Sequence, residues 1–260
     1  MLFLNAYEDE FCSESYSQIE FPGCYYLAYR DLPELIFKYR QKGKAVDFGC
    51  GAGRSTRFLN KLGFDTTGID ISANMIKKAQ ELDPLGKYQL IEDGDFSALP
   101  QNEFDLVLSV FTFDNIPDEE KRVKMFKGLS KLLNDHGILV CLDSTPEMYF
   151  NEWASFSTKD FPENKYAKSG EKVKIINTEM QDRRPVEDIF WTGEDYKKCF
   201  KKAGLKLIRT HKTYGKETEP FNWINETKIA PWVIYILKKK YSTDYSYYEI
   251  IAKISQSLLL

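Results

Sequence analysis

The run Val46-Asp47-Phe48-Gly49-Cys50-Gly51-Ala52-Gly53 sets the architecture of this chain. Three glycines at alternate positions follow a short buried strand and precede a helix expected from Ser55 to about Leu62. Glycine permits positive φ and lets the backbone approach a ligand closely. The first N–H groups of the following helix have no partner within it. The run therefore predicts a ligand-binding loop at the carboxyl end of the strand.

The spacing of these glycines does not fit the dinucleotide fingerprint GxGxxG, because Arg54 stands where that pattern needs its third glycine. Asp47, just before the loop, would repel a pyrophosphate but can accept hydrogen bonds from an ammonium group or from water. The loop therefore favours a ligand with a cationic amino-acid part over a nicotinamide dinucleotide.

Strands and helices alternate around this run, which predicts an α/β fold with a mostly parallel sheet covered by helices on both faces. A helical lead-in is expected over 25–41. The strands of this sheet are expected over 44–48, 65–69, 88–92, 104–110, 137–142, 205–211 and 232–237. Helices are expected from Ser72, as N-cap, to Leu82, from Pro117 to about Asn134, and from Gly193 to Ala203.

Residues 144–190 interrupt this alternation. We expect a helical stretch over 147–157 and β-like runs over 172–178 and 186–191. The segment is rich in aromatic side chains, which favours a lid over a small acceptor molecule. The chain is predicted to be one domain over 1–260, with a helical cap at 1–42, a lid at 144–190 and a tail at 241–260.

Composition narrows the class of protein. The chain has 260 residues, a net charge of -3, five cysteines and two histidines. This balance gives no basic footprint for nucleic acid, and an odd cysteine count without CxxC pairs argues against a disulfide framework or a metal site. The N-terminus turns acidic too early for a signal peptide, and no apolar run approaches the ~18 residues of a membrane span. We expect a cytoplasmic protein, and the oligomeric state stays open.

Acidic residues follow the next two strands. Asp70 ends the second strand, where an acid in this type of fold binds ribose hydroxyls. Asp95 and Phe96 follow the third strand, where they can hold an adenine. The alternatives are that Asp70 caps the following helix, although Ser72 suits that role, and that Asp95 belongs to a simple Asp-Gly turn.

Four motifs in order, at 46–53, 68–72, 93–96 and 104–111, resemble those of the class I S-adenosylmethionine-dependent methyltransferases. The resemblance covers about residues 40–142, and the strand–helix order continues to about 238. It implies a Rossmann-like methyltransferase fold with seven strands in the order 3-2-1-4-5-7-6, the seventh antiparallel. It also implies S-adenosyl-L-methionine as the cofactor.

The resemblance implies roles for individual residues. The homocysteine part of the cofactor would lie on Gly49 and Gly51, with Asp47 near its amino group, and Asp70 would bind the ribose. The remaining contacts it implies are Ile71, Met75, Asp95 and Phe96 at the adenine and the Ser109 backbone near the sulfonium. We also expect Tyr25 to border the methyl group and Arg30 to pair with the cofactor carboxylate, unless this segment is only an aromatic-packed helix.

Methyl transfer is an in-line displacement, so the enzyme mainly aligns donor and acceptor. A base is needed only if the acceptor loses a proton. Asp114 and His211 are the candidates, although a capping Asp and a structural His are the plainer interpretations. The hypothesis is N- or O-methylation of a small molecule, with no metal. The alternatives are a non-catalytic or regulatory cofactor-binding protein and an NAD-dependent oxidoreductase.

Overall fold

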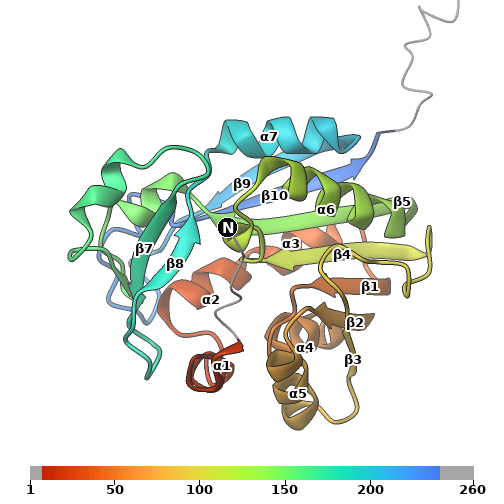
Figure 1. Cartoon of the computed structure of the whole chain (residues 1–260), viewed down its shortest axis with the longest axis horizontal. Coiled ribbons are helices and arrows are strands. Elements are labelled where there is room, and N and C mark those ends of the chain that lie inside the picture. Colours follow the sequence, from red (N-terminus) through yellow and green to blue (C-terminus); the bar gives the residue numbers. More distant parts are fainter. Residues whose placement is uncertain (1–7, 241–260) are drawn as a thin grey trace, which may run out of the picture.

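A seven-stranded sheet runs through the molecule in the order β3-β2-β1-β4-β5-β10-β9 (Figure 1). The computed structural model describes residues 8–240. The strands are β1 Gly43–Phe48, β2 Phe64–Asp70, β3 Lys87–Leu90, β4 Phe104–Val110, β5 Leu133–Ser144, β9 Leu205–Thr213 and β10 Trp232–Lys239. β10 is antiparallel to both of its neighbours, and β1 to β5 are parallel. The predicted fold and strand order are confirmed.

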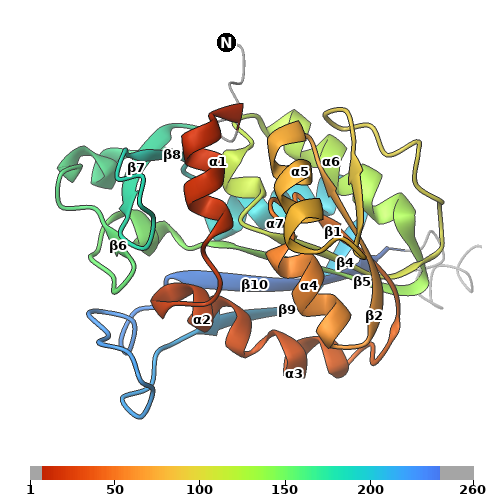
Figure 2. The same ribbon diagram turned by 90° about the horizontal axis from the view of Figure 1, so that it is seen from below.

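Helices cover both faces of this sheet because the strands are apolar on both sides. Along β4, Leu106 and Leu108 belong to one core, and Val107 between them belongs to the other. The first core lies under α2 (Gly23–Arg30), α3 (Leu32–Phe37) and α4 (Arg54–Lys61), and the second lies under α6 (Glu119–Leu132) and α7 (Gly193–Lys202). α1 (Glu10–Ser17) lies beside α5 (Ala73–Leu82), as Figure 2 shows.

The helical lead-in predicted over 25–41 is broken in two at Asp31. Pro33 lies in the first turn of α3, where its missing N–H costs nothing, so it favours a new helix start. The carboxylate of Asp31 binds the side chains of Arg30 and His211. The break therefore joins α2 to the edge strand β9.

Residues 144–190 form a second, antiparallel sheet of β6 (Phe156–Ser157), β7 (Lys172–Asn177) and β8 (Val186–Ile189). The 3₁₀ turns η3 (Pro146–Tyr149) and η4 (Pro162–Tyr166) accompany it. The helix predicted over 147–157 was wrong. Glu152 accepts hydrogen bonds from the Ser157 hydroxyl at 2.8 Å and the Thr158 N–H at 2.6 Å. Such local bonds hold a tight turn in competition with a helix.

The division into cap, lid and tail stays a prediction. The tail at 241–260 lies outside the described residues. Within 8–240, no helix has both the length and the apolar character that crossing a membrane requires.

Candidate functional site

The glycine loop forms the floor of a cleft at the carboxyl ends of β1, β2 and β4. Gly49 and Gly51 have φ values of +69° and +52°. A Cβ on Gly49 would lie 2.2 Å from the Thr112 hydroxyl, so that glycine permits close packing. A Cβ on Gly51 would meet only Tyr16 at 3.9 Å and Met75 at 4.0 Å. Gly51 therefore leaves room in the cleft for a ligand to lie on the backbone.

The cleft has a volume of about 850 Å³ with its open mouth included, within the range of small-ligand sites. Five of the predicted cofactor residues line it. These are Gly49, Gly51, Asp70, Ile71 and Met75.

Asp70 is the polar anchor of the cleft. Its Oδ2 accepts the Gly51 N–H at 2.9 Å, and its Oδ1 accepts the Ser72 N–H at 2.8 Å. Ser72, not Asp70, caps α5, because the Ser72 hydroxyl accepts the Met75 N–H. Burial raises the pKa of Asp70, although these N–H donors oppose that rise. Each carboxylate oxygen can accept a further bond, so Asp70 can still bind hydroxyl groups of a ligand.

The far end of the cleft is apolar, and the residues that line it are not Asp95 and Phe96, which were expected to contact the adenine. Ile91, Ile116 and Met125 line it, together with Asp93. Asp95 follows Gly94 (φ +77°), is exposed and accepts the Ser97 N–H at 2.8 Å. The Asp-Gly turn interpretation fits this position better.

Phe96, Asp47 and Ser109 also lie away from the cleft. The Phe96 ring packs on Phe48 in the core under α6. Asp47 is buried behind the loop, where it accepts the hydroxyls of Ser55 at 2.7 Å and Thr56 at 2.6 Å, and burial raises its pKa to about 6. Ser109 is fully buried, and the following residues, Val110 and Phe111, line the cleft in its place.

Arg30 and His211 lie at the edge of the sheet. Arg30 pairs with Asp31 and Glu219, and His211 Nε2 lies 2.8 Å from Asp31 Oδ2. Asp31 and Glu219 hold these two side chains at the sheet edge, so neither lines the cleft or the two smaller cavities beside it.

Arg54 follows the glycine loop directly and lines a small pocket beside Gly49 and Gly51. Its guanidinium lies 4.5 Å from the centre of the Tyr25 ring and donates to the Tyr16 hydroxyl at 2.9 Å. In the sequence, Arg54 spoke only against a dinucleotide site. Its position directly after the third glycine is the feature that could have identified it.

A second cavity adjoins the cleft and shares Tyr16, Phe111 and Asn115 with it. Phe111 has φ +60°, a conformation that costs a non-glycine residue energy and occurs mainly at functional sites. The Phe111 carbonyl accepts the Asn115 side-chain amide at 3.1 Å, which holds the chain where the two cavities meet. Tyr25 lines this second cavity, as does the small sheet of residues 144–190.

Two carboxylates line the second cavity. Asp114, in η2 (Phe113–Asn115), accepts the N–H and hydroxyl of Ser144 at 3.1 and 2.7 Å. Asp188, on β8, accepts the Tyr149 hydroxyl at 3.1 Å. Burial, and then the charge of Asp114, raises the pKa of Asp188 to about 8. Asp114 was a sequence candidate; Asp188 was not, because it lies in the insertion, far along the chain.

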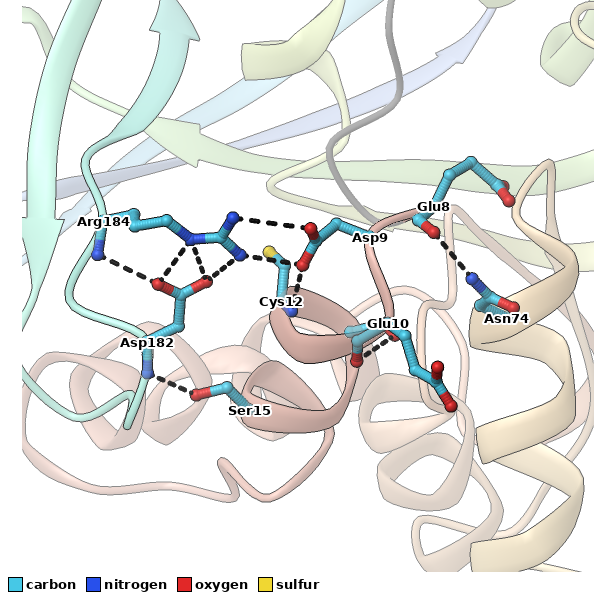
Figure 3. Close-up of polar contacts among 9 residues, drawn as sticks. Glu8, Asp9, Glu10, Cys12, Ser15, Asn74, Asp182 and Arg184 are labelled. Carbon is cyan, nitrogen blue, oxygen red and sulfur yellow. Dashed lines mark hydrogen bonds and ion pairs between the residues drawn. The ribbon is translucent and has the colours of Figure 1, made fainter.

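α1 lies beside the site, and polar contacts hold it from both sides (Figure 3). The Arg184 guanidinium binds Asp9 at 2.8 Å and Asp182 at 2.7 Å. On the other side, the Asn74 amide donates to the Glu8 carbonyl at 2.9 Å. Tyr16, on α1, lines the cleft, the second cavity and the pocket of Arg54. No sequence motif marks it.

The sheet order and the glycine loop with Asp70 beside it together define the Rossmann-like methyltransferase class. The family model described as a methyltransferase domain matches residues 46–141. A putative S-adenosylmethionine-dependent methyltransferase from Listeria monocytogenes has the same fold, with a TM-score of 0.61 at 15% identity over 83% of this chain and 98% of that one.

Relatives agree with this class. The N-demethylindolmycin N-methyltransferase of Streptomyces griseus is 24% identical over 63% of this chain and 69% of its own length. The 2-methyl-6-phytyl-1,4-hydroquinone methyltransferase of Synechocystis is 37% identical over 38% of this chain and 31% of its own length. The chain is a class I S-adenosylmethionine-dependent methyltransferase, and S-adenosylmethionine is its cofactor.

The residues present fit this cofactor. Gly51 leaves the backbone open, Asp70 can accept from ribose hydroxyls, and the apolar end suits a flat base. In the described part of the chain, no group of three or more His, Cys, Asp or Glu side chains could hold a metal ion.

Proposed function

We propose that this protein transfers a methyl group from S-adenosylmethionine to a small-molecule acceptor by N- or O-methylation. One observation carries the proposal: a glycine-lined cleft adjoins a second, smaller cavity across Tyr16, Phe111 and Asn115. The cofactor, when bound, supplies an electrophilic methyl group on a sulfonium. A relative named for N-methyl transfer supports this acceptor class.

The residues of the cleft bind and orient. Gly49 and Gly51 lie under the amino-acid part of the cofactor, and Asp70 binds the ribose. Ile71 and Met75 border the base. We assign the cofactor carboxylate to Arg54 in place of Arg30, because Arg54 lines the pocket beside the loop.

The acceptor occupies the second cavity. Its volume is about 500 Å³ with its mouth included, which limits the acceptor to a small molecule. Tyr25 and Phe111 border the reacting centre, and orientation by such walls can lower the barrier by several kcal/mol. Asp114, together with Asp188, is the candidate base for an acceptor that loses a proton.

The cytoplasmic location of the protein stays a prediction.

Thermal unfolding with S-adenosylhomocysteine and with NAD tests the cofactor site. A ligand at 100 times its dissociation constant stabilises by about 2.7 kcal/mol, which for this size shifts the midpoint by roughly 5–10 °C. We expect that shift with S-adenosylhomocysteine, a smaller one in Asp70→Ala, and none with NAD.

Asp65→Ala is the control, because Asp65 pairs with Lys87 on the exposed end of β2. No shift with S-adenosylhomocysteine in folded wild-type protein would overturn the proposal. If S-adenosylhomocysteine shifted the midpoint but no labelled methyl group were transferred to any acceptor tested, the regulatory alternative would be favoured.

A further inference from the structure

The second cavity has an aromatic wall. Four rings contact one another in a closed circuit, with centroids 4.5 to 5.9 Å apart. All four line the cavity. They are Tyr25, Phe111, Phe156 and Trp232. Aromatic faces attract ammonium groups as well as apolar ones, and the attraction is stronger where water is excluded.

Two carboxylates lie on the same cavity. Arg122 is near enough to oppose the rise in the pKa of Asp114, whereas no basic side chain of the described residues acts on Asp188. Among residues 8–240, neither Asp114 nor Asp188 forms an ion pair with a basic side chain. The Asp114 oxygens already accept from Ser144 and Tyr196. Asp188 uses only Oδ2, with Tyr149, so Oδ1 is left for a ligand. A carboxylate in such surroundings is costly unless a cation or a hydrogen-bond donor meets it.

Tyr25 supplies a second polar anchor in the same cavity. It is 3% exposed, and its hydroxyl oxygen accepts the Asn177 side-chain amide at 2.7 Å. The hydroxyl hydrogen has no acceptor among the described residues. A buried donor without a partner costs free energy, so a ligand that bonds to Tyr25 would gain that energy.

We propose that the methyl acceptor is an amine with an apolar body, whose nitrogen binds Asp188 inside this aromatic wall and is the atom methylated. This inference rests on the proposed function and narrows it from N- or O-methylation to N-methylation. A bound ammonium group would favour the ionised form of Asp188 and supply its counter-charge, which an alcohol, a phenol or an anionic acceptor cannot do.

The carboxylate also gives the nitrogen a place to lose its proton. Asp188 takes the proton that leaves the ammonium group, and the freed lone pair forms the bond to the methyl carbon. The carbon–sulfur bond breaks with its electron pair left on sulfur. Burial raises the pKa of Asp188 to about 8, so this pKa differs less from that of an ammonium group, and the proton transfer costs less.

Calorimetric titration of the protein saturated with S-adenosylhomocysteine tests the inference. The probes are two matched sets: phenethylamine, 2-phenylethanol and phenylacetate, and tryptamine, tryptophol and indoleacetate. We expect an amine to bind at least about tenfold more tightly than the alcohol of its set, since a bond to a charged group is worth that much. We expect Asp188→Asn to abolish this preference.

Glu187→Gln is the matched control, because Glu187 precedes Asp188 on β8 but is exposed and paired with Lys172. The control should keep the amine preference. Equal or tighter binding of an alcohol or an acid, or no binding of either amine at millimolar concentration, would overturn the inference. The wild-type comparison decides this even if Asp188→Asn does not fold. Failure to bind S-adenosylhomocysteine itself would instead reject the proposed function.

Discussion

At the scale of the residue, Gly51 is the glycine of the loop whose missing Cβ leaves space open to a ligand. Its φ of +52° strains any side chain, and a Cβ would enter the space beside Tyr16 and Met75. We expect Gly51→Ala to lose about 1–2 kcal/mol of stability and to weaken S-adenosylhomocysteine binding about tenfold. Calorimetric titration and urea unfolding measure the two effects.

A substitution at Gly63 is the control that distinguishes backbone strain from steric blocking of the ligand. It has φ +93° at the end of α4, and a Cβ there would meet nothing within 4 Å. Gly63→Ala should therefore lose similar stability and keep its affinity. Equal loss of affinity in both variants would mean that the cleft does not bind the ligand at Gly51.

Residues on the main strands were predictable because their place in the sheet follows from their place in the sequence. Gly49, Gly51 and Asp70 follow apolar strands, and the carboxyl ends of parallel strands meet at one edge. Asp188 and Tyr16 were not predictable. They reach the site from β8 and α1, and no local pattern shows where these elements pack.

At the scale of the element, polar contacts on both sides hold α1 beside the site (Figure 3). Arg184 joins Asp9, at the start of α1, to Asp182. We expect Arg184→Gln to speed amide hydrogen exchange in residues 10–17 severalfold, because local opening depends on such contacts. S-adenosylhomocysteine should also dissociate faster, since Tyr16 lies on α1.

Lys197→Gln serves as the control for this prediction. It also removes an exposed cation from an ion pair, with Glu194 on α7. Exchange in residues 10–17 should stay unchanged in that variant. If Arg184→Gln exchanged like wild type in this segment, the guanidinium would not hold α1.

The elements themselves were predictable where apolar runs are long. The strand over 104–110 has the bounds expected, because it is buried on both faces. The segment 147–157 was not predictable as a turn. Its aromatic residues have a helix-like distribution, but Glu152 and the bridge between Trp153 and Phe156 hold it in a turn.

At the scale of the whole molecule, burial of carboxyl groups makes stability depend on pH. Burial raises the pKa of Asp47 from 3.8 to about 6 and that of Asp188 from 3.8 to about 8. Below about pH 4, both are protonated in the folded and the unfolded chain. Above that, the unfolded chain has released these protons and the folded chain still holds them, so raising the pH favours unfolding.

The free energy of unfolding should therefore fall from about pH 4 to 8, by on the order of 1 kcal/mol per pH unit between about pH 6 and 8. Carboxyls with a lowered pKa, such as Asp9 and Asp182, cannot compensate, because their contribution changes only below about pH 4. Urea unfolding at steps of about one pH unit measures the slope. Asp188→Asn should reduce the slope above about pH 6 without abolishing it, because burial also raises the pKa of Asp143. The Asp47 part of the slope, below about pH 6, should stay intact. A wild-type stability that rises from pH 6 to 8 would show that Asp188 is already ionised in the folded protein.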